Sequence, residues 1–444
     1  MSSSVSINAP PDTHGAHAAA TREAQGSVQS QPGVGMVVDT PPDAARPSPA
    51  EESAASEANQ AQVSASPQPA EAPMGEFGRI EVEVHTRWTA PLRAEVIGFL
   101  RSLPAPAGVC IEHDPRWLDV LGEAMGHRPR MLLARDPGGR LLGYLPLAWV
   151  NTLFNRLYFG GFLVSLPYLN RGGAVAVHPA VAHRLIDRAV GLSEELGARY
   201  LEMRHGERIT HASLGGARDD KVRMVMELPA PGVDMMEFHK AKVRAQVRKG
   251  DRFNFTVHFG AGELLEDFHE VFSINMRDLG TPVYSRHLFG AVLKHFPDQA
   301  ELAVVRHEVR PVACALLVHD VGEGRVCGPQ TPTCTQVPSA SCLREANEMN
   351  ANMWMYHQLL VRAQSRGSRE FDFGRSSVES GTWRFKKQWG AQERPTVWQY
   401  HLRRGDMNAM RPDNPGNQRK VEMWKKLPLW LTRAAGPVIV KAIP

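Results

Sequence analysis

Residues 371–391 read FDFGRSSVESGTWRFKKQWGA, in which a short apolar strand runs directly into a dense set of polar side chains. The strand ends at Gly374, and cations and hydroxyls follow at once. They are Arg375, Ser376, Ser377, Arg384, Lys386 and Lys387. Such a density after a core strand indicates either a solvated loop or an anion-binding site, because ligands of α/β sheets commonly sit at the carboxyl end of a central strand.

Two ionisable side chains of this stretch are the main candidates for chemistry. Asp372 alternates with two phenylalanines, so we expect its carboxylate to be buried and to need a partner. Two explanations of that burial are open: a structural ion pair with Arg375 or Arg384, and a catalytic role. We place Lys386 on a loop and expect it to be exposed.

The order of the expected elements repeats along the chain. The first half shows a strand, two helices, a hairpin, a helix and a strand, at about 80–88, 91–103, 115–125, 130–150, 179–196 and 199–204. After a helix at 234–249, the second half shows the same order at about 253–259, 263–279, 285–295, 301–320, 348–366 and 369–373. This is also the element order of GNAT-type acyltransferases. We therefore expect an α+β fold with a tandem pair of GNAT-like domains, whose mixed sheets are flanked by helices.

Composition sets the expected domain limits. Residues 1–75 contain no aromatic residue and no Lys, and they carry 2 Arg against 8 Asp and Glu, a net of −6. Such a segment buries too little apolar surface to fold, so we expect a disordered tail over 1–76. Residues 76–444 then carry +10. We expect GNAT-like domains at 77–228 and 229–412, and an amphipathic tail at 413–444.

Several classes of protein are disfavoured by what the sequence lacks. No basic segment followed by an apolar one begins the chain, and no uncharged apolar run is long enough to span a bilayer. The five cysteines show no zinc-site spacing, and we interpret them as reduced structural thiols. We therefore expect a cytoplasmic protein without a metal or a tightly bound cofactor.

Three further groups of side chains are candidates for binding. Lys240, Arg244 and Arg248 recur every four residues, which gives either a solvated helix face or a phosphate contact. Arg277, Asp278 and Tyr284 surround a Gly-Thr-Pro turn that either caps a helix or lines a pocket. The third group joins the opening stretch to polar residues further upstream, namely Arg344, Asn347 and Asn352.

Four blocks of the sequence resemble FemAB-like proteins, in the branch found beside exosortase (PEP-CTERM) and exopolysaccharide genes. The opening stretch matches a signature close to FDFGRS…GTxRFKKQWGA, with Trp383 where an aromatic such as Tyr is commoner. The other blocks are SLPYLNRGG at 165–173, KVRAQVRK at 242–249 and MRDLGTPVYSR at 276–286. The resemblance covers roughly 78–435.

The resemblance implies transfer of an acyl or aminoacyl group to an amine of a cell-envelope precursor, either a peptidoglycan peptide or an amino sugar of an exopolysaccharide. It implies aminoacyl-tRNA or acyl-CoA as the donor substrate, and a nucleotide- or lipid-linked glycan precursor as acceptor. Lys386 would lie by the reacting carbonyl, followed by Trp389, while Asp372 would take a proton or orient the amine. Arg375, Ser376, Arg384 and Lys387 would bind substrate. The alternative outside enzymes is a GNAT-fold binding module in polysaccharide assembly.

The tail also leaves two interpretations open. Its two tryptophans stand among leucines and lysines, as in WKKLPLWLTR at 424–433. Such a segment either touches a membrane interface, at the inner face of the membrane, or packs back on the domain.

Overall fold

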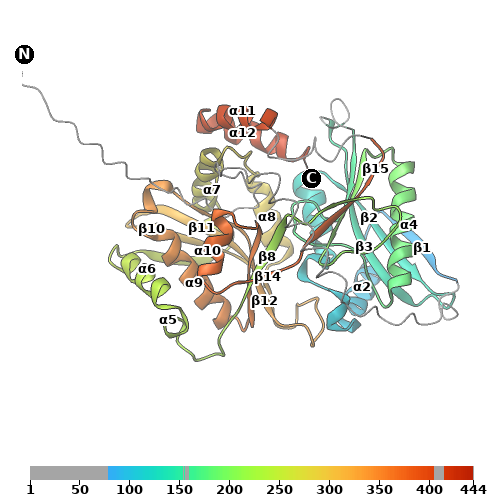
Figure 1. Ribbon diagram of the computed structural model, residues 1–444, viewed down its shortest axis with the longest axis horizontal. Helices are drawn as coiled ribbons and strands as arrows, with labels where there is room; N and C mark the ends of the chain where they lie inside the picture. Colours follow the sequence, from blue (N-terminus) through green and yellow to red (C-terminus); the bar gives the residue numbers. More distant parts are fainter. Residues whose placement is uncertain (1–78, 154, 156–159, 405–414, 444) are drawn as a thin grey trace, which may run out of the picture. The chain divides into compact units, whose positions relative to one another are not determined.

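The computed structural model describes residues 79–153, 155, 160–404 and 415–443, which form two mixed sheets flanked by helices (Figure 1). The disordered tail expected over 1–76 lies outside these residues. The α+β class expected from the sequence is therefore confirmed for the described part of the chain.

The first sheet has the strand order β1-β2-β3-β4-β6-β15-β7, with β5 paired to β3. Its strands are β1 (Glu81–His85), β2 (Arg128–Arg135), β3 (Leu141–Val150), β4 (Phe162–Val164), β5 (Val175–Ala176), β6 (Tyr200–His205), β7 (Gly216–Arg218) and β15 (Val397–Leu402). The helices of this half are α2 (Ala90–Ser102), η3 (Ala105–Ala107), η4 (Ile111–His113), α3 (Arg116–Val120), η5 (Leu121–Met125) and α4 (Pro179–Glu195).

The second sheet has the order β14-β8-β13-β12-β11-β10-β9. Its strands are β8 (Lys221–Glu227), β9 (Thr256–Gly260), β10 (Ala300–His307), β11 (Arg310–Asp320), β12 (Cys334–Cys342), β13 (Glu370–Ser377) and β14 (Gln392–Arg394). The helices are α5 (Met235–Phe238), α6 (Ala241–Asp251), η7 (Gly262–Leu264), α7 (Leu265–Leu279), α8 (Arg286–His295), η8 (Arg344–Ala346), α9 (Ala351–Ser365), α10 (Gly381–Gln388), α11 (Pro415–Lys425) and α12 (Leu429–Val440).

Local sequence explains the regular elements. β3 reads LLGYLPLAWV and is buried along its whole length, as expected of a strand covered on both faces. α4 begins with Pro179 at its first turn, where a missing N–H costs little, and Gly197 follows its end with a φ of +65°. Both features match the helix expected at 179–196.

Two local expectations were wrong. The helix expected at 234–249 is divided into α5 and α6, because His239 and Lys240 adopt extended backbone conformations. The segment after Gly374 is not a loop. β13 continues to Ser377, and α10 then begins at the N-cap Ser380, whose hydroxyl accepts a hydrogen bond from the Trp383 amide at 3.2 Å.

The two halves of the chain exchange strands. β8 precedes the boundary expected at 228/229 but lies in the second sheet, between β13 and β14. β15 belongs to the segment expected as the second domain, yet it lies in the first sheet between β6 and β7. Each sheet therefore needs a strand from the other half of the sequence.

A buried polar contact also joins the halves. The Glu112 carboxylate, on η4, is 2% exposed and accepts hydrogen bonds from Gln336 Nε2 on β12 at 3.0 Å and from Arg171 at 3.4 Å. Burial alone raises the pKa of Glu112, but Arg171 and Arg223 outweigh it and lower that pKa to about 2. The carboxylate is therefore ionised inside the protein at neutral pH.

Replacing Glu112 should weaken the pH dependence of stability. Because its pKa falls from the usual 4.5 to about 2 on folding, the carboxylate stabilises the fold above about pH 4.5, and this contribution is lost as the pH falls toward 2. In urea unfolding, Glu112→Gln should cost on the order of 3 kcal/mol at neutral pH and clearly less at about pH 3. The exposed control Glu207→Gln should change little. An equal cost for Glu112→Gln at both pH values would contradict this assignment.

Candidate functional site

β12 and β13 diverge soon after they pair. These parallel neighbours match over three positions, from Cys334 to Gln336 on β12, although both strands continue beyond them. From Val337 onward, the edge of β12 that faces away from β11 has no strand partner in the described part of the chain. Its backbone amides are therefore available to a ligand entering between the strands.

A bulge in β13 lies beside this gap and is held by a lysine. The register of β13 against β8 shifts between Asp372 and Arg375, and Gly374 has a φ of +79°, which favours glycine. Lys386 Nζ donates to the carbonyls of Gly374 and Arg375, both at 3.1 Å. Lys386 lies on α10 and is 0% exposed, so the expected exposed loop lysine was wrong.

Asp372 is buried, as expected, but its partner is a different arginine. Its Oδ2 accepts a hydrogen bond from Arg223 Nε on β8 at 2.9 Å, and its Oδ1 accepts one from the Gly374 amide at 2.8 Å. Neither Arg375 nor Arg384 forms this pair. Both carboxylate oxygens are thus engaged by groups that fix the bulge.

Arg375 is the half-buried cation of the site. Its guanidinium lies 3.4 Å from the ring centre of Trp398 on β15, and Arg204 contacts the same ring at 3.9 Å. Arg204 is paired with Glu202, whereas the Arg375 guanidinium donates no hydrogen bond to a side chain or carbonyl in the described residues. Burial, reinforced by Arg204, lowers the pKa of Arg375 to about 9, which still leaves it cationic at neutral pH.

Two buried hydroxyls stand on the diverging strands. Ser339 on β12 and Ser376 on β13 are 0% exposed, and the described residues offer their Oγ atoms no hydrogen-bond partner. Buried polar atoms without partners are rare and often indicate a bound water or ligand. Ser376 was a predicted substrate contact, whereas nothing in the sequence pointed to Ser339.

The other predicted residues of α10 lie around this core. Arg384 and Lys387 are exposed, and Lys387 Nζ pairs with Glu393 at 3.0 Å. Trp389 is buried with its ring against Tyr356 and His239. Trp389 is therefore part of the packing between α9 and α10.

The residues near the Gly-Thr-Pro turn form a group of their own. Arg277 pairs with Asp278 at 2.7 Å, and Arg344 Nη2 donates to the Asp278 carbonyl at 2.7 Å. Tyr284 is buried with its ring edge against Tyr168, and burial raises its pKa. Of the two other predicted residues, Asn347 directly follows η8 and Asn352 lies in the first turn of α9.

Of the three basic residues Lys240, Arg244 and Arg248, one is engaged in a hydrogen bond and two are exposed. Val243 and Val247 are buried, as the amphipathic pattern predicted. Arg244 donates to the His239 carbonyl, while Lys240 and Arg248 are exposed. The phosphate contact expected for these three residues stays a prediction.

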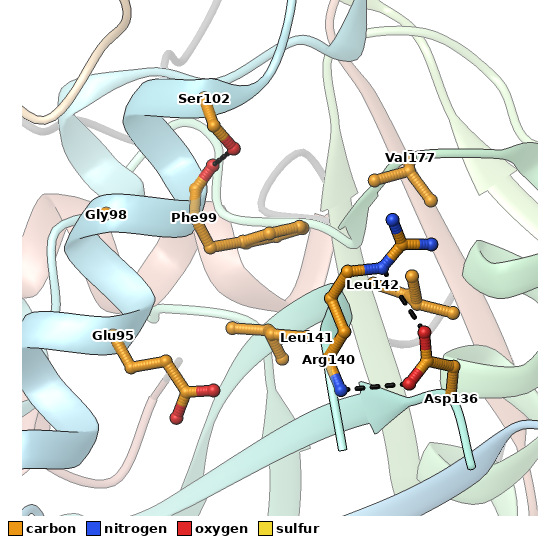
Figure 2. A pocket seen from close by; sticks show the side chains of 9 residues that line it. All are labelled: Glu95, Gly98, Phe99, Ser102, Asp136, Arg140, Leu141, Leu142 and Val177. Atoms are coloured by element: carbon orange, nitrogen blue, oxygen red, sulfur yellow. Dashed lines mark hydrogen bonds and ion pairs between the residues drawn. The ribbon is translucent and has the colours of Figure 1, made fainter. Parts of the chain in front are cut away.

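A cavity of about 630 Å³ lies away from these residues, between α2 and the β2–β3 turn (Figure 2). Its polar groups are satisfied locally, since Arg140 pairs with Asp136 and Ser102 donates to the Phe99 carbonyl. None of the residues predicted to bind substrate lines it. We therefore do not assign the chemistry to this cavity.

Residues 238–387 match the family model described as an acetyltransferase (GNAT) domain. This segment is therefore similar to GNAT acetyltransferase domains. The matched segment contains β12, β13 and Lys386, so it includes the diverging strands and the bulge. The enzyme class expected from the sequence, acyltransferase, is confirmed by this match.

The solved structure of FemX extends the likeness in fold beyond this segment. The crystal structure of FemX is 13% identical, with a TM-score of 0.50 over 78% of this chain and 100% of that chain. The tandem GNAT protein from the clavulanic acid biosynthesis pathway is 11% identical, with a TM-score of 0.48 over 74% of this chain and 100% of that chain. The C-terminal domain of a putative lysylphosphatidylglycerol synthetase from Agrobacterium fabrum is 12% identical, with a TM-score of 0.43 over 70% and 93%. No curated protein matches the sequence.

At these identities the likeness concerns the fold. Together with the two sheets, the FemX likeness and the GNAT match confirm the tandem GNAT-like architecture. The branch found beside exosortase genes stays a prediction. Among the described residues, no group of three or more His, Cys, Asp or Glu side chains could hold a metal ion.

Several residues at the site were missed from the sequence, and most gave no local signal. Arg171 stands in the SLPYLNRGG block, which the resemblance had marked, although the residue itself was not selected. The others reach the site through pairing between distant segments. They are Glu112, Arg223, Gln336, Ser339 and Trp398.

Lys386→Met should destabilise the fold and abolish transfer. Removing the buried ammonium leaves the Gly374 and Arg375 carbonyls without that donor, at about 1–3 kcal/mol for each unsatisfied group. The neighbouring Lys387→Met is the matched control, because an exposed ion pair contributes about 1 kcal/mol or less. Thermal unfolding and a transfer assay of both variants decide the matter. If Lys386→Met were as stable and active as Lys387→Met, the bulge would not depend on this lysine.

Proposed function

We propose that the chain transfers an acyl or aminoacyl group to an amine of an anionic cell-envelope precursor, a peptidoglycan peptide or an exopolysaccharide amino sugar. The observation that carries the proposal is Arg375. This cation is half-buried, has no acidic hydrogen-bond partner in the described residues, and stands beside the gap between β12 and β13. A phosphate group on the acceptor would supply the missing partner.

The open edge of β12 supplies the acyl-transfer chemistry. Attack of an amine on the donor carbonyl gives a tetrahedral oxyanion, and preorganised backbone amides stabilise such a charge. The amides beyond Val337 have no strand partner on this side. The Ser339 hydroxyl, buried on the same strand, is a further donor available to the substrate.

In this proposal Lys386 and Asp372 are positioning residues. Lys386 donates hydrogen bonds to the Gly374 and Arg375 carbonyls. Asp372 accepts hydrogen bonds from Arg223 and from the Gly374 amide. Together they hold the bulge from which Arg375 extends. The sequence had suggested direct catalytic roles for both residues.

The segment before α9 favours an aminoacyl ester over acyl-CoA as donor. A pyrophosphate is usually held by glycine-rich backbone at a helix N-terminus. Residues 343–350, between β12 and α9, contain no glycine and include the exposed Glu345 and Glu348. Two exposed cations, Lys240 at the N-cap of α6 and Arg248 within this helix, add a surface suited to a polyanion such as tRNA. Acyl-CoA is the alternative donor.

Donor binding separates these alternatives. We expect aminoacyl-tRNA to raise the melting temperature and acetyl-CoA to leave it unchanged, because a ligand stabilises a protein only when it binds the folded state. The same mixtures with UDP-linked amino-sugar acceptors should form an amide product, detected by mass spectrometry. Product formation from acetyl-CoA alone would establish the alternative donor. If neither donor binds and neither gives product, the proposed function is wrong.

Arg375→Gln should raise KM for a phosphorylated acceptor about 10- to 100-fold and change kcat little, as loss of one charge-assisted contact costs about 1.5–3 kcal/mol. The same variant should act normally on an acceptor without phosphate. Arg87→Gln, at an exposed arginine just after β1, is the control. A loss of kcat with both acceptors at unchanged KM would instead assign Arg375 a purely structural role.

A further inference from the structure

The C-terminal helices α11 and α12 pack on α7 (Figure 1). Val421 of α11 lies against Gly280, and Gly436 of α12 lies so close to Val283 that an added Cβ would come within 2.8 Å of it. Arg433 Nε donates to Ser273 Oγ at 2.8 Å. The helix pair is thus held in place by specific contacts, which confirms that the tail packs back on the protein.

The two faces of α12 differ in an unusual way. Thr432, Gly436 and Val440 are buried and recur every four residues, so they form the face docked on the protein. Trp430, Ala434 and Val438 are shifted by two residues, about 200° around the helix, and they are exposed. The outward stripe of a surface helix is normally polar. Here it is apolar, with Trp430 and Val438 exposed by 70% and 59%.

More exposed apolar side chains accompany this stripe. Met423 on α11 is 68% exposed and Ile443, after α12, is 52% exposed. Leu153 is 73% exposed in the segment after β3, and Asn155 of the same segment donates to the Ala442 carbonyl at 2.8 Å. We call Met423, Trp430, Val438, Ile443 and Leu153 the apolar tail surface.

The charges near this surface are almost all positive. Residues 415–444 contain one acidic residue, Glu422, against six basic ones, a net of +5. The basic residues are Arg419, Lys420, Lys425, Lys426, Arg433 and Lys441. Glu422 is paired with Lys425 at 2.6 Å, whereas Lys420 and Lys426 are exposed and have no carboxylate partner in the described residues. The complementary partner is therefore anionic.

We propose that the apolar tail surface and its lysines bind an anionic lipid surface, with α12 lying in the plane of the membrane interface. An apolar helix face with a Trp, next to basic residues, is suited to the boundary between headgroups and acyl chains. A two-fold dimer through the same face would bring these like charges together, which is unfavourable. Among the described residues, none of the helices has the length and hydropathy of a membrane span.

Vesicle sedimentation tests this inference without any substrate, so its outcome is independent of the proposed function. The full chain should bind vesicles of phosphatidylcholine with phosphatidylglycerol and bind pure phosphatidylcholine weakly. Trp430→Ser with Val438→Ser should reduce the affinity at least about tenfold by removing buried apolar area. Lys420→Gln with Lys426→Gln should reduce it about fivefold for each lysine and weaken its salt dependence.

The matched control is Val309→Ser, an 85% exposed valine on the β10–β11 turn, which should bind as the unchanged protein does. Melting temperatures of all variants should agree, since every altered side chain is exposed. Equal vesicle binding by the tail variants and the control would overturn the inference. So would a dimer in light scattering that dissociates on Trp430→Ser with Val438→Ser in a chain that does not bind vesicles.

Discussion

The bulge in β13 is the constraint on which the site depends. After Asp372, the extra residue shifts the alternation of side chains, so that Arg375 reaches Trp398 of the first sheet while Asp372 stays with Arg223 of the second. The bulge also leaves two carbonyls, of Gly374 and Arg375, to which the buried Lys386 ammonium donates. An ammonium in the protein interior is costly unless such acceptors surround it. The lysine and the bulge therefore require one another.

Because the two halves of the sequence exchange strands, residues from both halves contact one another at the site. Arg375 belongs to β13 of the second sheet, whereas Trp398 belongs to β15, which pairs with β6 and β7 of the first. Glu112, from the first half, meets Gln336 at the last position where β12 pairs with β13. Both strands that border the gap belong to the second sheet, and residues of the first half of the structure, Glu112 and Trp398, contact their side chains. Neither half alone would give Arg375 its contact with Trp398 or Gln336 its contact with Glu112.

The fold was largely predictable because its information is local. The alternation in residues 80–88, where β1 lies, the proline at the start of α4 and the repeated order of elements all gave the right element types. The exchanged strands were not predictable in this way, because β8 and β15 look like any other strand and their partners are far away in the sequence. Within the site, the sequence located Asp372, Arg375 and Lys386 but not their partners.

The prediction that Lys386 is exposed was wrong, and the error has a physical cause. A lysine among other charges after a glycine resembles a loop residue, and only the packing of α10 on β13 shows that its side chain turns inward. Trp398 and Ser339 carried no signal at all, since a tryptophan in a strand and a serine after a proline are common in any core. Residues that act through contacts between distant segments can therefore be identified only once the structure is known.

The tail and the open edge of β12 are linked through α7. Arg433 of α12 donates to Ser273, and two residues further along α7 Asn275 Nδ2 donates to Ser341 Oγ of β12 at 3.1 Å. Ser341 lies in the part of β12 that has already left β13. The helix that receives the tail therefore also supports the strand edge assigned to the acyl group. If α12 lies on a membrane, the orientation of that edge relative to the lipid surface is fixed by the same helix, as the use of a lipid-linked acceptor would require.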